Sequence, residues 1–340
     1  MQADPGGLCV SALHRTGRGI WQLVRRDVVR AALGWAAIAL LGLGTPAAAA
    51  QTKPGNWRNC DPGGIQTLLV PDPVSGRSYD VEISLPPDYD ADTSKRHPVL
   101  YLADGGRATR PLTCLVKALY SKGELTEEPI IVGLSYAKGE TLEVSRKRDY
   151  TPVPLKPGDT AYGGGQAYQL YLRATVIPHV ESLYRVDPGQ RLYWGHSYGG
   201  LLGTRILLTE PGLFKTYILG SPSLWFADHA ILALEADYAK ANSDLKANVL
   251  MYVGGLEVSR YEPARRGQTR DMVGDMKAFE ARLKQRSFPS LSIRSLVVPG
   301  KNHRNTIPPG FTWAITSALG GGKTMQSRQG VLRSAGSEGP

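Results

Sequence analysis

The sequence predicts an α/β protein built on a mostly parallel sheet, and three observations carry that prediction. Short continuous apolar runs, such as residues 99–103 and 249–253, are typical of strands buried on both faces. These runs alternate along the chain with longer segments of helical period, as parallel sheets with crossover helices require. The 340 residues, 42% of them hydrophobic, suffice for one large domain with a substantial core.

The first fifty residues have the composition of an export signal. Arg25, Arg26 and Arg30 precede twenty uncharged residues, which end in Ala48-Ala49-Ala50. A basic segment, an apolar segment and a small-residue site together indicate a secretory signal, and the paired arginines loosely resemble a twin-arginine signal. An uncleaved anchor is the alternative, because twenty apolar residues can just span a bilayer. We therefore expect a periplasmic or secreted protein with no membrane contact in its mature form, unless the leader is uncleaved.

This leader sets the predicted domain boundaries. Residues 1–50 are the signal peptide or N-terminal anchor, residues 51–319 form a single α/β domain, and residues 320–340, which are rich in Gly and Ser, form a disordered tail. The oligomeric state is left open.

Charge and cysteine content limit the partners. The net charge of +10 is spread along the chain and is accompanied by no nucleic-acid-binding motif, so a small molecule is the expected partner. No Cys or His spacing indicates a metal site, no strand-to-helix glycine motif indicates a nucleotide, and we expect no cofactor. Cys60 and Cys114 form either one disulfide in an exported protein or two free thiols.

The remaining elements follow from periodicity and from turn residues. A leading antiparallel hairpin is expected around a Pro-Asp-Pro turn, and a long irregular insertion is expected from Arg146 to Gly165. The predicted strands are 67–70, 79–85, 99–103, 129–134, 191–194, 215–220, 248–254 and 293–298, and the predicted helices are 112–122, 168–184, 201–208, 271–286 and 311–319.

A candidate nucleophile lies between one such strand and helix. Gly195-His196-Ser197-Tyr198-Gly199 fits G-x-S-x-G, in which a strand ends, the chain turns sharply through a strained serine, and a helix begins. The flanking glycines are needed where strand and helix approach each other. The motif alone is weak, but its position after residues 191–194 and before residues 201–208 supplies the required context. Ser197 is therefore the predicted nucleophile.

A serine hydroxyl is a weak nucleophile and needs a base oriented by an acid, in the chain order Ser, acid, His. Among the histidines after Ser197, His303 lies on a glycine-containing loop just after the last predicted strand, where the base belongs. Glu257, three residues past the preceding strand, is the preferred acid. Asp271 and Asp275 remain alternatives, as does a Ser-His pair without an acid.

The oxyanion hole in this arrangement takes one backbone N–H from the residue after the nucleophile and one from the loop after the third strand. Tyr198 supplies the first, and the loop Gly105-Gly106 is placed to supply the second. A plain tight turn is the alternative for the two glycines.

These residues resemble the esterase D-like branch of the α/β-hydrolases, and within it the siderophore esterases that act on enterobactin and salmochelin. The similarity extends from about Ser78 to Ala318. It is carried by R-K-R-D-Y-T-P at Arg146–Pro152, the triple glycine at Gly163, I-P-H-V-E-S-L-Y before the elbow, G-H-S-Y-G-G at the elbow, S-P-S-L-W at Ser221–Trp225 and G-K-N-H at Gly300–His303.

The resemblance implies an α/β-hydrolase fold in which helices flank both faces of the sheet. It also implies that Arg146 or Arg148 and Trp225 border the substrate cleft, with an arginine meeting an anionic group of the substrate. The sequence thus predicts an exported serine hydrolase that cleaves carboxylic esters, siderophore trilactones among them, through an acyl-enzyme. Two alternatives stay open: an acyltransferase with the same residues, and a binding domain without catalysis.

Overall fold

The computed structural model describes residues 60–261 and 270–321. The predicted leader at residues 1–50, and the predicted tail except for its first two residues, lie outside these ranges. In the described part of the chain, no helix is both long and apolar enough to cross a membrane.

One eight-stranded sheet organises the described residues, with the order β1-β2-β4-β3-β5-β6-β7-β8. The pairs β1/β2 and β2/β4 are antiparallel and all later pairs are parallel, which confirms the leading hairpin and the mostly parallel sheet. The strands are β1 Gln66–Pro71, β2 Ser78–Ser84, β3 His97–Leu102, β4 Ile130–Ala137, β5 Val186–His196, β6 Thr216–Gly220, β7 Ala247–Gly254 and β8 Leu291–Val298.

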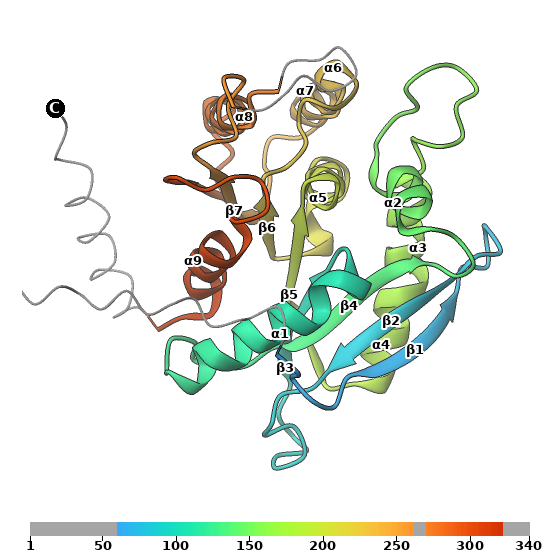
Figure 1. Ribbon diagram of the computed structural model, residues 1–340, viewed down its shortest axis with the longest axis vertical. Helices are drawn as coiled ribbons and strands as arrows, with labels where there is room; N and C mark the ends of the chain where they lie inside the picture. Colours follow the sequence, from blue (N-terminus) through green and yellow to red (C-terminus); the bar gives the residue numbers. More distant parts are fainter. Residues whose placement is uncertain (1–59, 262–269, 322–340) are drawn as a thin grey trace, which may run out of the picture. The chain divides into compact units, whose positions relative to one another are not determined.

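Helices cover both faces of the sheet (Figure 1). They are α1 Gly105–Ser121, α2 Leu142–Tyr150, α3 Gly165–Tyr171, α4 Ile177–Leu183, α5 Tyr198–Thr209, α6 Phe226–His229, α7 Ile231–Ala241, α8 Met272–Gln285 and α9 Ile307–Leu319, with a π-helical turn η1 at Leu172–Val176 and a 3-10 turn η2 at Pro211–Leu213.

Successive side chains of one strand build two separate cores. In β3, Val99 and Tyr101 point to the face covered by α3, α4, α5, α7 and α8, whereas Leu100 and Leu102 point to the face covered by α1 and α9. All four are fully buried. A strand apolar on both faces is what the continuous runs in the sequence predicted.

Parts of the element prediction were wrong. The insertion predicted from Arg146 to Gly165 is irregular between α2 and α3, but its first residues belong to helix α2, whose first turn is capped by the Thr141 hydroxyl accepting from the Val144 N–H at 3.4 Å. The helix has no apolar stripe, and its charged residues form ion pairs instead. The periodicity of apolar residues therefore does not reveal it. Helices α6 and α7 were also not anticipated.

The helical segment before the elbow is less regular than its spacing indicated. It comprises α3, the π-helical turn η1 and α4. The sequence places Leu172, Val176, Val180 and Leu183 at helical spacing. The first three are buried, including Val180 beyond the π turn, but Leu183 at the end of α4 is half exposed. The spacing therefore fails only at the C-terminal end of α4.

The N-terminal arm of the described chain is fastened to α1. Cys60 and Cys114 form a disulfide with their Cα atoms 6.3 Å apart. Next to it, Arg110 pairs with Asp61 at 2.9 Å, and Lys117 Nζ donates to the Pro62 carbonyl at 2.9 Å. The open question between a disulfide and two free thiols is therefore resolved as a disulfide.

Candidate active site

The elbow has the strained geometry that its sequence predicted. Ser197 has φ 60° and ψ −118°, between the end of β5 and the start of α5. A Cβ added at Gly195 would lie 2.2 Å from the Gly199 carbonyl oxygen, and one at Gly199 would lie 3.0 Å from the Ala103 side chain. Glycine at both positions allows the strand and the helix to approach closely. The sharp turn between them places Ser197 at the carboxyl edge of the sheet.

The predicted base and acid are joined directly. His303 Nδ1 lies 2.6 Å from Glu257 Oε2. The other carboxylate oxygen, Oε1, accepts from the Ser221 hydroxyl and from the Gly254 N–H, each at 2.7 Å. Glu257 is completely buried, whereas the His303 side chain keeps 30% of its surface exposed. The carboxylate is thus fixed at three points, and its orientation determines that of the imidazole.

The two alternative acids have other partners. Asp271 caps α8 by accepting from the Gly274 N–H at 2.9 Å, and Asp275 lies 2.9 Å from His229 Nε2. Neither is the carboxylate that contacts His303.

The nucleophile hydroxyl is engaged by a second serine. Ser197 Oγ lies 3.2 Å from Ser223 Oγ, and the Ser223 N–H donates to the Ser197 carbonyl at 3.2 Å. Within the described residues, Ser197 Oγ makes its hydrogen bond to Ser223 and not to His303. Catalytic hydrogen bonds are often long in a free enzyme, so this arrangement is compatible with a resting state from which the hydroxyl rotates toward the base.

Ser197 and His303 line the same pocket, which has a volume of about 890 Å³. Tyr198, Gly105 and Gly106, the three residues predicted to form the oxyanion hole, line it too. Helices α1 and α5 both begin there, at Gly105 and Tyr198 respectively. The first N–H groups of a helix lack partners within it and carry its positive end, so two helix termini converge where an oxyanion would form.

In the pocket wall, the carboxylate of Asp104 accepts several hydrogen bonds. Asp104, in the left-handed conformation with φ 62°, precedes Gly105. Its carboxylate accepts from Tyr136 Oη at 2.8 Å and from Arg146 Nε and Nη2 at 2.6 and 3.0 Å. Its N–H donates to Tyr150 Oη at 3.0 Å. Burial opposes the charge on Arg146, but the Asp104 carboxylate outweighs it, and the pKa of Arg146 is raised.

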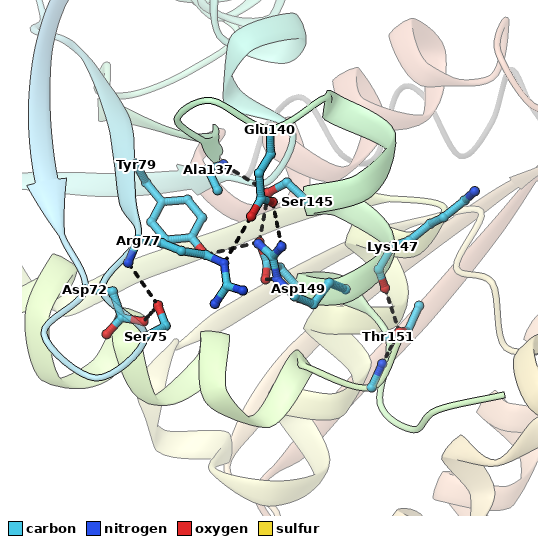
Figure 2. A network of polar contacts seen from close by, with 12 residues as sticks. Asp72, Ser75, Arg77, Tyr79, Ala137, Glu140, Ser145, Lys147, Asp149 and Thr151 are labelled. Atoms are coloured by element: carbon cyan, nitrogen blue, oxygen red, sulfur yellow. Dashed lines mark hydrogen bonds and ion pairs between the residues drawn. The ribbon is translucent and has the colours of Figure 1, made fainter. Parts of the chain in front are cut away.

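The two arginines of α2 have different surroundings. Arg146 lines the pocket, whereas Arg148 is absent from its lining. Arg148 donates to Asp149 at 2.8 Å and to Glu140 at 2.5 Å, in the polar network that also holds Arg77 and Tyr79 (Figure 2). The geometry therefore gives Arg148 a role between α2 and the β1–β2 hairpin, and gives no support to its prediction as a substrate-binding residue.

Trp225 also lies away from the pocket lining. It is 4% exposed and packs against Tyr198 and Phe226, with ring centroids 6.4 and 6.5 Å apart. It packs beside the first residue of the elbow helix and belongs to the core, so the geometry gives no support to its prediction as a substrate-binding residue.

The pocket is lined by more positive than negative side chains. Arg107 and Arg304 line the pocket and are exposed. Arg110 and Lys147 also line it, and they pair with Asp61 and Glu143 respectively. The complete set of charged lining residues is Arg107, Arg110, Arg146, Lys147, Arg304, Glu82, Asp104 and Glu143. Such a lining favours an anionic ligand.

A second histidine packs against the base. The rings of His196 and His303 have their centroids 4.5 Å apart. Burial, together with the neighbouring His303 and Arg146, holds the pKa of His196 well below its usual range. His196 is consequently neutral at physiological pH and adds no charge beside the base.

No group of three or more His, Cys, Asp or Glu within residues 60–261 and 270–321 is arranged to hold a metal ion.

Comparison with known proteins identifies the family. The family model described as "Putative esterase" matches residues 73–292. The chain belongs to this family. It is accordingly a hydrolase that acts on ester bonds, as its sequence motifs predicted.

Several relatives carry siderophore names. The chain is 28% identical to the ferri-bacillibactin esterase BesA of Bacillus subtilis over 57% of this chain and 71% of that protein. It is 30% identical to a siderophore triacetylfusarinine C esterase of Aspergillus fumigatus over 46% of this chain and 55% of that protein. The apo-salmochelin esterase of Escherichia coli is 32% identical over 40% of this chain and 45% of that protein. The matched segment thus spans about half of the last two relatives.

Solved structures share the fold. An IroE-like serine hydrolase from Shewanella oneidensis has a TM-score of 0.65 at 23% identity, covering 75% of this chain and 80% of that one. The BES protein from Bacillus cereus has a TM-score of 0.63 at 23% identity, covering 76% of this chain and 95% of that one. These similarities and the sheet order establish the predicted α/β-hydrolase fold.

Sequence reasoning missed four residues around the predicted ones. Ser221 and Ser223 hold the acid and the nucleophile, and Asp104 and Tyr136 underlie the oxyanion loop. A signal existed for three of them, because Asp104 lies two residues past the end of β3, and Ser221 and Ser223 lie one and three residues past the end of β6. In a parallel sheet those strand ends meet at the edge where the site lies.

Proposed function

We propose that this protein is an exported serine esterase that hydrolyses siderophore esters through an acyl-enzyme. The observation that carries the proposal is the hydrogen bond from a completely buried Glu257 to His303, which lines the same pocket as the strained Ser197. An acid, a base and a partly exposed nucleophile at the ends of β7, β8 and β5 form the arrangement that activates a serine.

The reaction follows from the geometry. Glu257 keeps the proton of His303 on Nδ1, so Nε2 is free to accept the proton of Ser197 as Oγ attacks the ester carbonyl. The N–H groups of Tyr198 at the start of α5, and of Gly105 and Gly106 at the start of α1, stabilise the oxyanion. Collapse expels the alcohol, which receives the proton from His303. A water molecule then attacks the acyl-enzyme with the same base, releasing the acid and restoring Ser197.

The substrate class is supported by two independent observations. The curated relatives are named as siderophore esterases. The excess of cationic side chains at the pocket favours an anionic ester, and its volume of about 890 Å³ is within the range of sites that enclose a small molecule.

Export is supported by the composition of residues 1–50 and by the Cys60–Cys114 disulfide, since disulfides persist in oxidising compartments. Expression of the full chain in a bacterial host, followed by fractionation and N-terminal sequencing, should place a product beginning near Gln51 outside the cytoplasm. Retention of residues 1–50 in a membrane fraction would instead establish the anchor alternative.

Activity is tested with a fluorophosphonate probe and p-nitrophenyl butyrate. The wild type and a Ser121→Ala control, which changes an exposed serine of α1, should be labelled and should release nitrophenol, whereas Ser197→Ala should do neither. Folded wild-type protein that fails both assays would exclude the esterase. A screen over ferric and iron-free catecholate trilactones, feruloyl esters and simple acyl esters then identifies the substrate. Addition of competing alcohols distinguishes hydrolysis from acyl transfer.

A further inference from the structure

The sequence resemblance offered Arg146 or Arg148 as the arginine that meets an anionic group of the substrate, but the contacts of Arg146 indicate another role. Three of its five N–H groups are engaged within the protein: Nε with Asp104 Oδ1 at 2.6 Å, and Nη2 with both Asp104 Oδ2 and the His196 carbonyl at 3.0 Å. Its side chain is only 19% exposed. The charge is already paired with a carboxylate that is itself largely buried.

The two anchor points flank the two halves of the oxyanion hole. Asp104 immediately precedes Gly105. The His196 carbonyl belongs to the peptide bond between His196 and Ser197, and Tyr198 is the next residue. The guanidinium therefore connects the loop after β3 to the elbow after β5. The strands β3 and β5 are neighbours in the sheet, but their ends carry unrelated turns that the ladder of hydrogen bonds does not hold.

We propose that Arg146 is a positioning residue that fixes the separation of the two sets of oxyanion N–H donors. Only a planar guanidinium offers donors in the directions that the carboxylate and the carbonyl require, so lysine is not an equivalent residue here. Tyr136 and Tyr150 complete the arrangement by holding the Asp104 carboxylate and N–H. This inference rests on the proposed serine esterase function and adds to it the element that aligns the oxyanion hole.

A neutral ester separates this role from substrate binding. An arginine that binds a substrate anion affects the KM of anionic esters and leaves neutral ones unaffected. An arginine that aligns oxyanion donors affects kcat on every ester, because the donors act in the transition state. Misplacement of a catalytic group by about 1 Å is associated with a loss of about 100-fold.

The test compares Arg146→Lys with Arg148→Lys. Both changes conserve charge in the same helix and both perturb a buried ion pair, but Arg148 belongs to the network in Figure 2, away from the pocket. On p-nitrophenyl butyrate, Arg146→Lys should lower kcat about 100-fold with KM changed less than about two-fold. Its affinity for a trifluoromethyl ketone, which forms an oxyanion on Ser197, should fall by a similar factor. Arg148→Lys should change both values less than about three-fold.

Each outcome bears on the proposal. If Arg146→Lys does not fold, Tyr136→Phe takes its place; it removes one hydrogen bond to Asp104 and should lower kcat several-fold at constant KM. Equal effects of Arg146→Lys and Arg148→Lys would overturn the inference, as would a loss confined to the KM of an anionic ester such as p-nitrophenyl hemisuccinate. In both cases an active wild type would leave the esterase function standing. An inactive wild type would remove both.

Discussion

Replacement of Glu257 by glutamine tests the proposed mechanism most directly. The change keeps the shape of the side chain, and the surroundings determine how the amide must lie. The position of Oε1 receives hydrogen bonds from the Gly254 N–H and the Ser221 hydroxyl, each at 2.7 Å. The Gly254 N–H can only donate, so the amide oxygen occupies that position and the NH2 group faces His303 Nδ1.

The consequence for catalysis follows from the 2.6 Å contact between Glu257 and His303. An NH2 group there donates to Nδ1, so the ring proton moves to Nε2 and the imidazole no longer accepts the proton of Ser197. The same change of tautomer in a serine protease lowers kcat about 10⁴-fold, which corresponds to about 5.5 kcal/mol in the activation free energy. We expect a loss of that order for Glu257→Gln on p-nitrophenyl butyrate.

Asp271→Asn and Asp275→Asn are the matched controls, because these carboxylates cap α8 and pair with His229. Both should keep kcat within about three-fold of the wild type. Circular dichroism and thermal unfolding establish that all three variants are folded. A folded Glu257→Gln with kcat within ten-fold of the wild type would refute the reasoning, and so would a crippled Asp271→Asn beside an active Glu257→Gln.

Three further predictions concern reactivity and stability. Ser223→Ala removes the hydroxyl that engages Ser197 at 3.2 Å, so fluorophosphonate labelling should quicken by up to about ten-fold, the equivalent of one hydrogen bond; slower labelling would show that Ser223 assists the nucleophile instead. Opening the Cys60–Cys114 disulfide, which links residues 54 apart, should lower the free energy of unfolding by up to about 4 kcal/mol, so a denaturant midpoint unchanged by reductant would contradict it. Burial raises the pKa of Glu128 to about 7, so its stabilising contribution is present below pH about 4.5 and is lost as pH rises through about 7. Glu128→Gln should therefore raise Tm relative to the wild type at pH 8 and not at pH 5, and the gain in the free energy of unfolding at pH 8 should be at most about 3 kcal/mol. A difference in Tm that is the same at both pH values would exclude this account.

The sequence predicted the backbone of the site well because its signals are local. Gly195 and Gly199 fix the elbow around Ser197 by steric need, and the chain order of acid and base leaves few choices once the strands are recognised. Glu257 and His303 each follow a strand of clear apolar pattern, so their meeting at one edge of a parallel sheet could be anticipated.

The parts that were missed depend on contacts between distant segments. Helix α2 carries mostly charged residues, and what places Arg146 and Arg148 in different surroundings is the partner each finds, Asp104 in one case and Glu140 with Asp149 in the other. Two arginines separated by a single residue cannot be assigned to different roles by spacing alone. Similarly, nothing local in Ser221-Pro222-Ser223 shows that one hydroxyl reaches the acid and the other the nucleophile.

The order of the strands has a consequence for how activity is acquired. The reacting groups come from the ends of β3, β5, β7 and β8, and the base at His303 follows the last of these strands. A chain emerging during synthesis therefore presents Ser197 and Glu257 long before it has a base to orient. Among the described strands, β8 comes last in the sequence and pairs with β7 at the edge of the sheet, so the last of these strands to be made also completes the site. Recovery of esterase activity should accordingly report the last step of folding, later than signals from β3 and β5 at the centre of the sheet.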